Sequence, residues 1–385
     1  MSLRLVVDAG PLFPLGPGLG PTGVARWTTA ALAGLGRVAP DWRIDLVAFA
    51  LRPRVLPDLS WLPANASFRL IRFPGRPQRW LRTANLMPPI ELLVGPADAV
   101  LGPAYVTWPA RRAAELPVIH DLTHVRHPEL VSAGNLRWLR TLLPRVLRRA
   151  ALVLTVSETM RGEIVEHYRL APDRVAVVPN GCDAERFAGA GPRPAGLPAR
   201  YLLFVGTLEP RKNLARLLEA HRRLRETTPG APPLVIAGGI GWRVEGLVRD
   251  LEAHTRSGDV RVLGYVEDAL VPALYAHATA LLLPSLYEGF GIPVLEAMAA
   301  GCPVVTARRG GLPEVGGDAA VYVDPEDPGD IARGVAQLIA DDGLRRRLAT
   351  AGRGRAAEFT LERSGLALRH AIETSLARRA VRGGA

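Results

Sequence analysis

The 385-residue sequence is poor in cysteine, in lysine and in long apolar runs. Two cysteines, Cys182 and Cys302, cannot supply a disulfide framework, so we expect a reducing compartment, the cytoplasm. No apolar run reaches the roughly 18 residues that a membrane span requires. The first residues, MSLRLVVDAG, read directly as a strand, so we expect neither a signal peptide nor a transmembrane helix.

Lysine is almost absent, because 47 of the 48 basic residues are arginine and Lys212 is the single exception. The net charge of +11 is uneven: residues 1–190 carry 23 basic and 15 acidic residues, and residues 191–385 carry 25 and 22. A basic first half is typical of contact with nucleic acid or with an anionic membrane, although a coding bias toward arginine also explains it. Without a recognition motif or an interleaved aromatic stripe we expect no nucleic acid, which leaves peripheral membrane contact as the functional interpretation.

The chain is too long for one ordinary core, and its apolar runs alternate with helical patterns. We expect strands at Leu3–Val7, Ile44–Ala50, Phe68–Ile71, Ala99–Leu101, Pro117–His120, Leu152–Val156, Val175–Val178, Tyr201–Val205, Leu234–Ala237, Val260–Leu263, Ala280–Leu283, Val304–Thr306 and Ala320–Val323. Such alternation predicts an α/β protein with two doubly wound, Rossmann-like domains. The segment Ala188–Arg200, without periodicity, is the expected linker.

Two segments combine apolar residues with arginine on one side. They are Arg79–Leu93, which contains RWLRTANLMPPIELL, and Leu136–Arg149, LRWLRTLLPRVLRR. Each could be an amphipathic helix that meets a membrane surface, or a core-facing helix with a solvated face. The sequence leaves both interpretations open.

The most informative stretch is PSLYEGFGIPVLEAMAAG, residues 284–301. An apolar run stops at Pro284, a glycine-bearing loop carries Glu288, and Pro293 suits the first turn of a helix that carries Glu296 and ends near Gly301. A strand, a loop and a helix N-terminus together form a site for an anionic ligand. Two acids at such a site indicate a ligand that also has hydroxyl groups, such as a nucleotide sugar.

This Glu-x7-Glu stretch, EGFGIPVLEAMAAGCPVV, resembles the group 1 family of retaining glycosyltransferases with the GT-B fold. The resemblance implies that Glu288 faces the donor sugar and that Glu296 binds the ribose hydroxyls. It also implies an acceptor-binding domain (residues 1–190), a nucleotide-sugar-binding domain (191–360) and a C-terminal helix (361–385) that crosses back to the first domain. The two domains would face a cleft.

Other motifs extend the resemblance. The segment GTLEPRKN, residues 206–213, is similar to the family's phosphate-binding loop, so Gly206, Arg211 and Lys212 would hold the donor diphosphate, and Lys212 is the only lysine of the chain. In VIHDLTHVRHPE, His120 stands at a strand end and would hydrogen-bond a sugar hydroxyl. For Asp121, a role in the site and a role as a capping residue are equally compatible with the sequence. No metal-ligand pattern accompanies the histidines, so we expect no metal.

The remaining donor-side and acceptor-side positions follow from the same resemblance. Gly23 belongs to a loop that resembles the acceptor side, although Ala25 stands where the family usually has glycine. Backbone or side-chain contact with the nucleotide sugar is expected at Gly238, Gly239, Tyr265, Phe290, Gly291 and Ile292.

The expected function is metal-independent transfer of a hexose, mannose by preference, from a nucleotide-diphosphate sugar such as GDP-mannose to a hydroxyl of a glycan or lipid-linked acceptor. The nucleotide sugar is a co-substrate, and no cofactor is expected. The pattern is typical of surface polysaccharide or glycolipid synthesis in the cytoplasm, with a place at the inner face of the membrane if the basic half contacts it. Alternatives are a nucleotide-sugar epimerase or hydrolase of the same architecture, and a non-catalytic partner protein.

Overall fold

The computed structural model describes residues 3–13, 20–51, 56–73, 80–189, 191–242, 246, 251 and 255–383. It divides into two compact units: residues 1–14, 21–181 and 361–385 form unit 1, and residues 15–20 and 182–360 form unit 2. The chain passes between the units after Gly181, earlier than the expected boundary at residue 190. Residues 14–19, which belong to the segment between the first expected strand and Gly23, lie outside the described residues.

Unit 1 is built on a seven-stranded parallel sheet in the order β3-β2-β1-β4-β5-β6-β7. Its strands are β1 (Arg4–Asp8), β2 (Arg43–Phe49), β3 (Ala66–Ile71), β4 (Ala99–Gly102), β5 (Ala114–Ile119), β6 (Val153–Thr155) and β7 (Val175–Val177). Its α-helices are α1 (Gly23–Val38), α3 (Glu91–Val94), α4 (Thr123–Arg126), α5 (Ala133–Arg149), α6 (Glu158–Tyr168) and α15 (Leu361–Gly383). Buried residues on both faces of the central strands explain their continuous apolar sequences.

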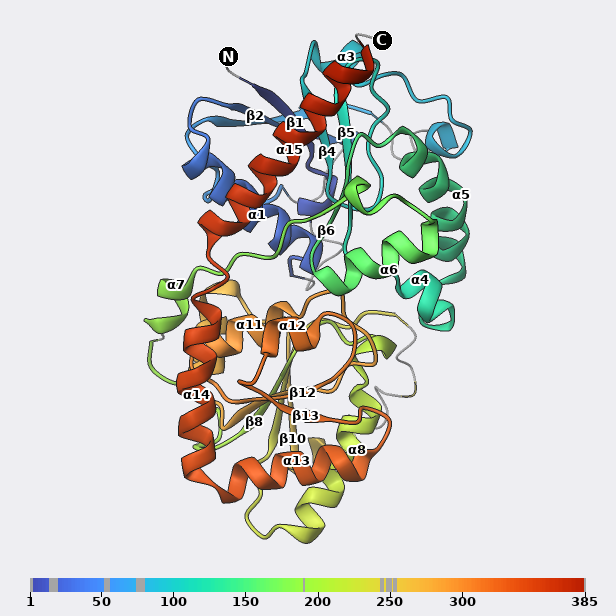
Figure 1. Ribbon diagram of the computed structural model, residues 1–385. Coiled ribbons are helices and arrows are strands. Elements are labelled where there is room, and N and C mark those ends of the chain that lie inside the picture. Colours follow the sequence, from blue (N-terminus) through green and yellow to red (C-terminus); the bar gives the residue numbers. More distant parts are fainter. Residues whose placement is uncertain are drawn as a thin grey trace. The chain divides into compact units, whose positions relative to one another are not determined.

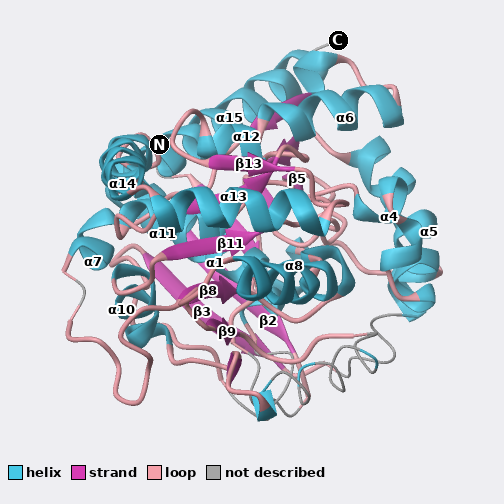
Figure 2. Cartoon of the chain, turned by 90° about the horizontal axis from the view of Figure 1, so that it is seen from below, coloured by secondary structure: helices cyan, strands magenta, loops and turns pink. Residues whose placement is uncertain are grey.

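Unit 2 repeats the plan with six parallel strands in the order β10-β9-β8-β11-β12-β13. Its strands are β8 (Leu202–Val205), β9 (Leu234–Ala237), β10 (Val260–Gly264), β11 (Ala280–Leu283), β12 (Val304–Ala307) and β13 (Val321–Val323). Its α-helices are α7 (Ala184–Ala188), α8 (Leu214–Thr227), α10 (Val271–Ala276), α11 (Ile292–Ala299), α12 (Leu312–Gly316), α13 (Pro328–Ala340) and α14 (Asp342–Ala356). Figure 1 shows the strands of unit 2 between helices of the same unit, and Figure 2 colours strands and helices apart.

Both sheets therefore confirm the expected doubly wound α/β class, and every expected strand is present within a few residues of its expected bounds. In this strand order the connections reverse direction between β1 and β4 in unit 1 and between β8 and β11 in unit 2. Ligands of such sheets bind beyond the carboxyl ends of the strands at this switch point. A ligand of unit 2 is consequently expected at the loops after β8 and β11.

The C-terminal helix α15 belongs to unit 1, where it packs along α1 (Figure 1). Two glycines make this contact close: a Cβ on Gly34 of α1 would lie 1.9 Å from the Leu361 carbonyl oxygen, and one on Gly365 of α15 would lie 2.2 Å from the Gly34 backbone. The side chains of Leu368 and Ile372 are fully buried. The chain thus leaves unit 1 after β7, builds unit 2 and returns to complete the core of unit 1.

Helix α5 settles one of the two open interpretations. Its apolar residues Leu139, Leu142, Leu143, Val146 and Leu147 are buried, so they are not available to a lipid surface. The core-facing interpretation of residues 136–149 is confirmed. The described part of the other segment differs, because Trp80, Leu86 and Leu92 are 63%, 59% and 67% exposed.

Candidate donor-binding site

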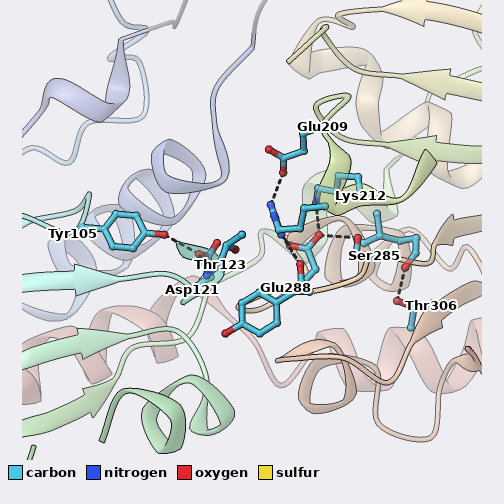
Figure 3. Close-up of polar contacts among 11 residues, drawn as sticks. Tyr105, Asp121, Thr123, Glu209, Lys212, Ser285, Glu288 and Thr306 are labelled. Carbon is cyan, nitrogen blue, oxygen red and sulfur yellow. Dashed lines mark hydrogen bonds and ion pairs between the residues drawn. The ribbon is translucent and has the colours of Figure 1, made fainter. Parts of the chain in front are cut away.

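A buried cluster of charges occupies the switch point of unit 2. Glu288, in the loop after β11, is ion-paired with two cations from the loop after β8: its Oε2 lies 2.5 Å from Arg211 Nη1, and its Oε1 lies 2.5 Å from Lys212 Nζ. Ser285 also donates to Glu288 Oε1, over 2.9 Å. Figure 3 shows the side chains of Lys212, Ser285 and Glu288 converging. The structure therefore brings Glu288 together with Lys212 and Arg211, which lie 76 and 77 residues before it in the sequence.

The backbone explains why the cluster can form. Asn213 adopts a left-handed conformation with φ of 61° and donates from Nδ2 to the carbonyls of Pro284 and Pro325. The Leu286 N–H donates to the Arg211 carbonyl over 2.9 Å. The loops after β8 and β11 are thereby joined, which fixes both cations beside the carboxylate.

A second acid orients Arg211. Glu209 is buried and its Oε1 lies 2.6 Å from Arg211 Nη2, while Arg211 Nη1 also donates to the Tyr287 carbonyl over 2.8 Å. The contact of Glu209 is with Arg211. The guanidinium is held on two sides, so its orientation is set before any ligand arrives.

The electrostatics of Glu288 follow from these neighbours. Burial by itself disfavours the charged carboxylate, but the charges and hydrogen bonds of Arg211 and Lys212 outweigh burial and lower the pKa of Glu288 to about 2. Glu288 is therefore ionised throughout the neutral range. It can act as a fixed charge or hydrogen-bond acceptor, but it carries no proton to donate.

Glu296 lies on α11, eight residues further along the chain, and is also buried. Its Oε2 accepts a hydrogen bond from the Tyr275 hydroxyl of α10 over 3.0 Å. Helix α11 starts after Gly291, whose φ of 114° and close approach to Leu312 admit only glycine comfortably. Ile292 is the first residue of this helix and Phe290 packs edge-on against Phe359, with ring centroids 5.6 Å apart.

The glycines expected to approach the nucleotide have structural partners as well. Gly238 has φ of 155°, and a Cβ there would lie 1.9 Å from the Gly206 carbonyl oxygen. The Gly239 carbonyl accepts from the Leu208 N–H over 2.9 Å. Gly238 is thus required for the close approach of the loops after β8 and β9, whatever it does for a ligand. Tyr265 follows β10 and is 42% exposed.

Unit 1 holds the two remaining predicted residues. His120 follows β5, and its Nε2 donates to the Pro103 carbonyl over 2.7 Å. Burial lowers the pKa of His120, although Pro103 and the Asp121 charge act in the opposite direction. The neutral ring that donates from Nε2 has Nδ1 as a hydrogen-bond acceptor. Gly23 is the first residue of α1, whose N-cap Thr22 accepts from the Ala25 N–H.

Asp121 has a local structural role: it accepts hydrogen bonds from the Tyr105 hydroxyl and from the Thr123 N–H, each over 3.0 Å (Figure 3). His124 bonds the Tyr168 hydroxyl and His127 contacts Glu129. No group of three metal-ligating side chains occurs among the described residues.

Sequence reasoning missed Ser285, Tyr275 and Asn213 as parts of this site. Ser285 had a local signal, because it stands three residues before Glu288. Asn213 ends the segment GTLEPRKN, but nothing local indicated that it bonds a loop 71 residues away. Tyr275 had no signal, because it is 21 residues from Glu296.

Comparisons with known proteins identify a glycosyltransferase family model for each half of the chain. Residues 194–355 match the family described as Glycosyl transferases group 1, and residues 21–186 match Glycosyltransferase Family 4. The chain is 36% identical over 263 residues to the O-antigen chain mannosyltransferase B of Escherichia coli, covering 66% of this chain and 68% of that protein. It is 33% identical to the MMP alpha-(1->4)-mannosyltransferase of Mycolicibacterium hassiacum, covering 63% of this chain and 60% of that protein.

Among solved structures, the sucrose-phosphate synthase of Thermosynechococcus elongatus superposes with a TM-score of 0.72 at 18% identity and full coverage of both chains. At this identity the likeness shows the fold, which is GT-B.

Proposed function

Because this chain belongs to the group 1 glycosyltransferases, we propose that it moves mannose from GDP-mannose to a hydroxyl of a glycan or lipid-linked acceptor with retention of the anomeric configuration. The observation that carries the proposal is the buried cluster of Glu288 with Arg211 and Lys212 at the switch point of unit 2. Two preset cations suit a diphosphate, and the similarity to two mannosyltransferases supports the sugar.

The cations have the main chemical task. As the bond between sugar and diphosphate breaks, negative charge grows on the departing phosphate, and Arg211 and Lys212 stabilise it electrostatically. They are oriented in advance by Glu288 and Glu209, so little reorganisation is needed at that moment. We propose that this arrangement replaces a divalent metal, so that excess chelator leaves the rate within about twofold.

In this proposal the two acids of the Glu-x7-Glu motif contact different parts of the donor. Glu296 accepts from the ribose hydroxyls, because it is fixed on a helix and held by Tyr275. Glu288 remains ionised and stabilises positive charge that develops on the sugar, while it keeps the cations aligned. In unit 1, the Nδ1 atom of the neutral His120 ring can accept a hydrogen bond from a hydroxyl group.

Lys212→Ala tests the phosphate role. We expect GDP to bind at least about tenfold more weakly, because a hydrogen-bonded buried charge is lost, whereas guanosine binds as before. Calorimetry with GDP and guanosine measures both affinities, and equal losses for the two ligands would contradict the role.

In the companion variant Glu288→Gln, turnover falls while GDP binds as well as or better than before. The reason is that the substitution removes a carboxylate that competes with the diphosphate for Arg211 and Lys212.

The reaction itself is tested by incubating the protein with GDP-mannose in the presence and absence of glycan acceptors. A transferase releases GDP rapidly only when an acceptor is present. Turnover of donor alone identifies an epimerase or hydrolase, and tight donor binding without turnover under any condition identifies a non-catalytic relative.

For location, we propose the cytoplasm, with peripheral contact between unit 1 and an anionic membrane surface. No helix in the described part of the chain has the length and apolar character of a membrane span. The excess of basic residues in the first half supports the contact.

A further inference from the structure

A cavity of about 340 Å³ opens on unit 1 beside the last turns of α5. It is lined by Ala84, Asn85, Arg145, Arg148 and Arg149, and is called the arginine cavity below. The three arginines occupy positions i, i+3 and i+4 of the helix, so they share one face. The opposite, apolar face of α5 is buried in the core, which fixes the helix and therefore the direction of this face.

The charge of the arginine cavity is only partly compensated. Arg149 Nε lies 3.4 Å from the buried carboxylate of Glu115, which also accepts from Thr107 and from the Ala110 N–H. Arg145 donates to the Thr83 carbonyl over 2.7 Å. Arg148 is exposed and has no ion pair or hydrogen bond within the described ranges. One carboxylate thus faces three guanidinium groups.

Capping of the helix does not account for these charges. Cations at the end of a helix can neutralise its last carbonyls, but here Arg174 donates to the carbonyls of Leu147 and Ala150 over 3.2 Å and 2.7 Å. Like charges at i, i+3 and i+4 repel one another. An anion in the cavity would relieve this repulsion.

The chemistry of the lining identifies the anion. Planar guanidinium groups match the oxygens of phosphate, and the Asn85 amide adds a neutral polar group. The segment that contributes Ala84 and Asn85 also exposes Trp80 and Leu86 to 63% and 59%. Tryptophan beside arginine is typical of a surface at the interface of a lipid bilayer.

We propose that the arginine cavity is a binding site for the phosphate group of an anionic phospholipid, with Trp80 and Leu86 entering the adjacent apolar layer. All of its residues lie in unit 1, whereas the diphosphate cations lie in unit 2. The inference deepens the membrane contact proposed above and rests on it for the lipid source. It is independent of the transfer reaction, because activity on soluble donor and acceptor needs no vesicle.

The test compares Arg148→Gln with Arg137→Gln in the full chain. Both arginines are exposed on α5 and both variants lose one charge, but Arg137 does not line the cavity. Sedimentation with vesicles of phosphatidylcholine and phosphatidylglycerol should show Arg148→Gln binding about tenfold more weakly, which exceeds the roughly fivefold that one diffuse charge near the membrane surface contributes. Arg137→Gln should lose less than this fivefold, and pure phosphatidylcholine should bind none of the three.

A second arm separates lipid from soluble phosphate. Glycerol phosphate is titrated against the same proteins and against Trp80→Ala. If Arg148→Gln loses glycerol phosphate binding and the other variants keep it, the result supports the phosphate site. If Trp80→Ala binds vesicles more weakly but binds glycerol phosphate as before, the result supports the lipid source. Equal losses in Arg148→Gln and Arg137→Gln, or no binding of either probe by the unaltered protein, would overturn the proposal.

The two proposals can fail separately. Transfer to a soluble acceptor is measured in each variant, and it should be unchanged in Arg148→Gln. Inactivity of all the proteins, with vesicle binding still dependent on Arg148, would count against the transferase and leave the phosphate site in place.

Discussion

Glu288 is a buried carboxylate whose neighbours keep it charged. Removing its charge would leave Arg211 and Lys212 buried beside a neutral amide, so we expect Glu288→Gln to lower the free energy of unfolding by about 3–5 kcal/mol at neutral pH. The variant also removes the contribution that ionisation of Glu288 makes to the free energy of unfolding. The destabilisation by Glu288→Gln therefore depends on pH.

The sign of that dependence follows from the direction of the shift. A carboxylate whose pKa falls from 4.5 unfolded to about 2 folded contributes stability above pH 4.5 and loses it as the pH falls toward 2. The contribution is about 3 kcal/mol at neutral pH. The difference in unfolding free energy between the unaltered protein and Glu288→Gln, measured in denaturant between pH 3 and 7, should therefore shrink below about pH 4.5. A difference that is constant over this range would contradict the assignment.

Tyr275 is a positioning residue for Glu296 in the proposed site. In Tyr275→Phe the carboxylate keeps its place in the fold but loses the hydroxyl that orients it. We expect the donor KM to rise and the GDP affinity to fall by about tenfold, with kcat little changed, because the lost hydrogen bond involves a charged group and acts on the nucleotide.

Tyr201→Phe is the matched control for this measurement. Tyr201 is equally buried, but its hydroxyl donates to the Leu274 carbonyl over 2.7 Å and contacts no acid of the site. Its loss should lower stability and leave the donor KM unchanged. If both variants raise KM alike, Tyr275 has only a general structural role.

At the scale of elements, the contact of α1 with α15 depends on the absence of a side chain. In Gly34→Ala the new Cβ would meet the Leu361 carbonyl oxygen, and this backbone cannot yield as a flexible side chain would. We expect a loss of about 1–3 kcal/mol in unfolding free energy. Thermal unfolding followed by circular dichroism measures the change.

Gly162→Ala, in the same unit, should have the opposite effect on stability from Gly34→Ala. Gly162 lies inside α6, and a Cβ there would meet no atom within 4 Å. Alanine in an open helix interior should stabilise the protein by about 0.5–1 kcal/mol. Equal effects of the two substitutions would show that helix propensity, and not the contact with α15, governs Gly34.

At the scale of the whole molecule, the chain leaves unit 1 after Gly181 and returns to it through α15. A defect in α15 should therefore damage unit 1 and spare the proposed nucleotide site of unit 2. We expect Leu368→Ala, at a fully buried position, to lower the unfolding free energy by about 2–5 kcal/mol, while the folded protein binds GDP as before.

Leu366→Ala is the control on the same helix, because Leu366 is 51% exposed and its truncation should cost little. Calorimetric titration at a temperature where both variants are folded gives the GDP affinity. A large loss of GDP affinity in Leu368→Ala would indicate that unit 2 depends on α15.

The sequence by itself determined the α/β class and the strands of the described residues, because continuous apolar runs are local signals. It placed Glu288, Arg211 and Lys212 in loops that follow strands, and the family resemblance supplied the roles proposed for them. It also singled out Lys212 through its uniqueness. Only the tertiary structure decided that Glu288 lies against both cations, that Tyr275 reaches Glu296 and that Gly238 faces Gly206. These contacts join loops that follow different strands, and their geometry depends on strand order and loop conformation, which no local pattern of residues specifies.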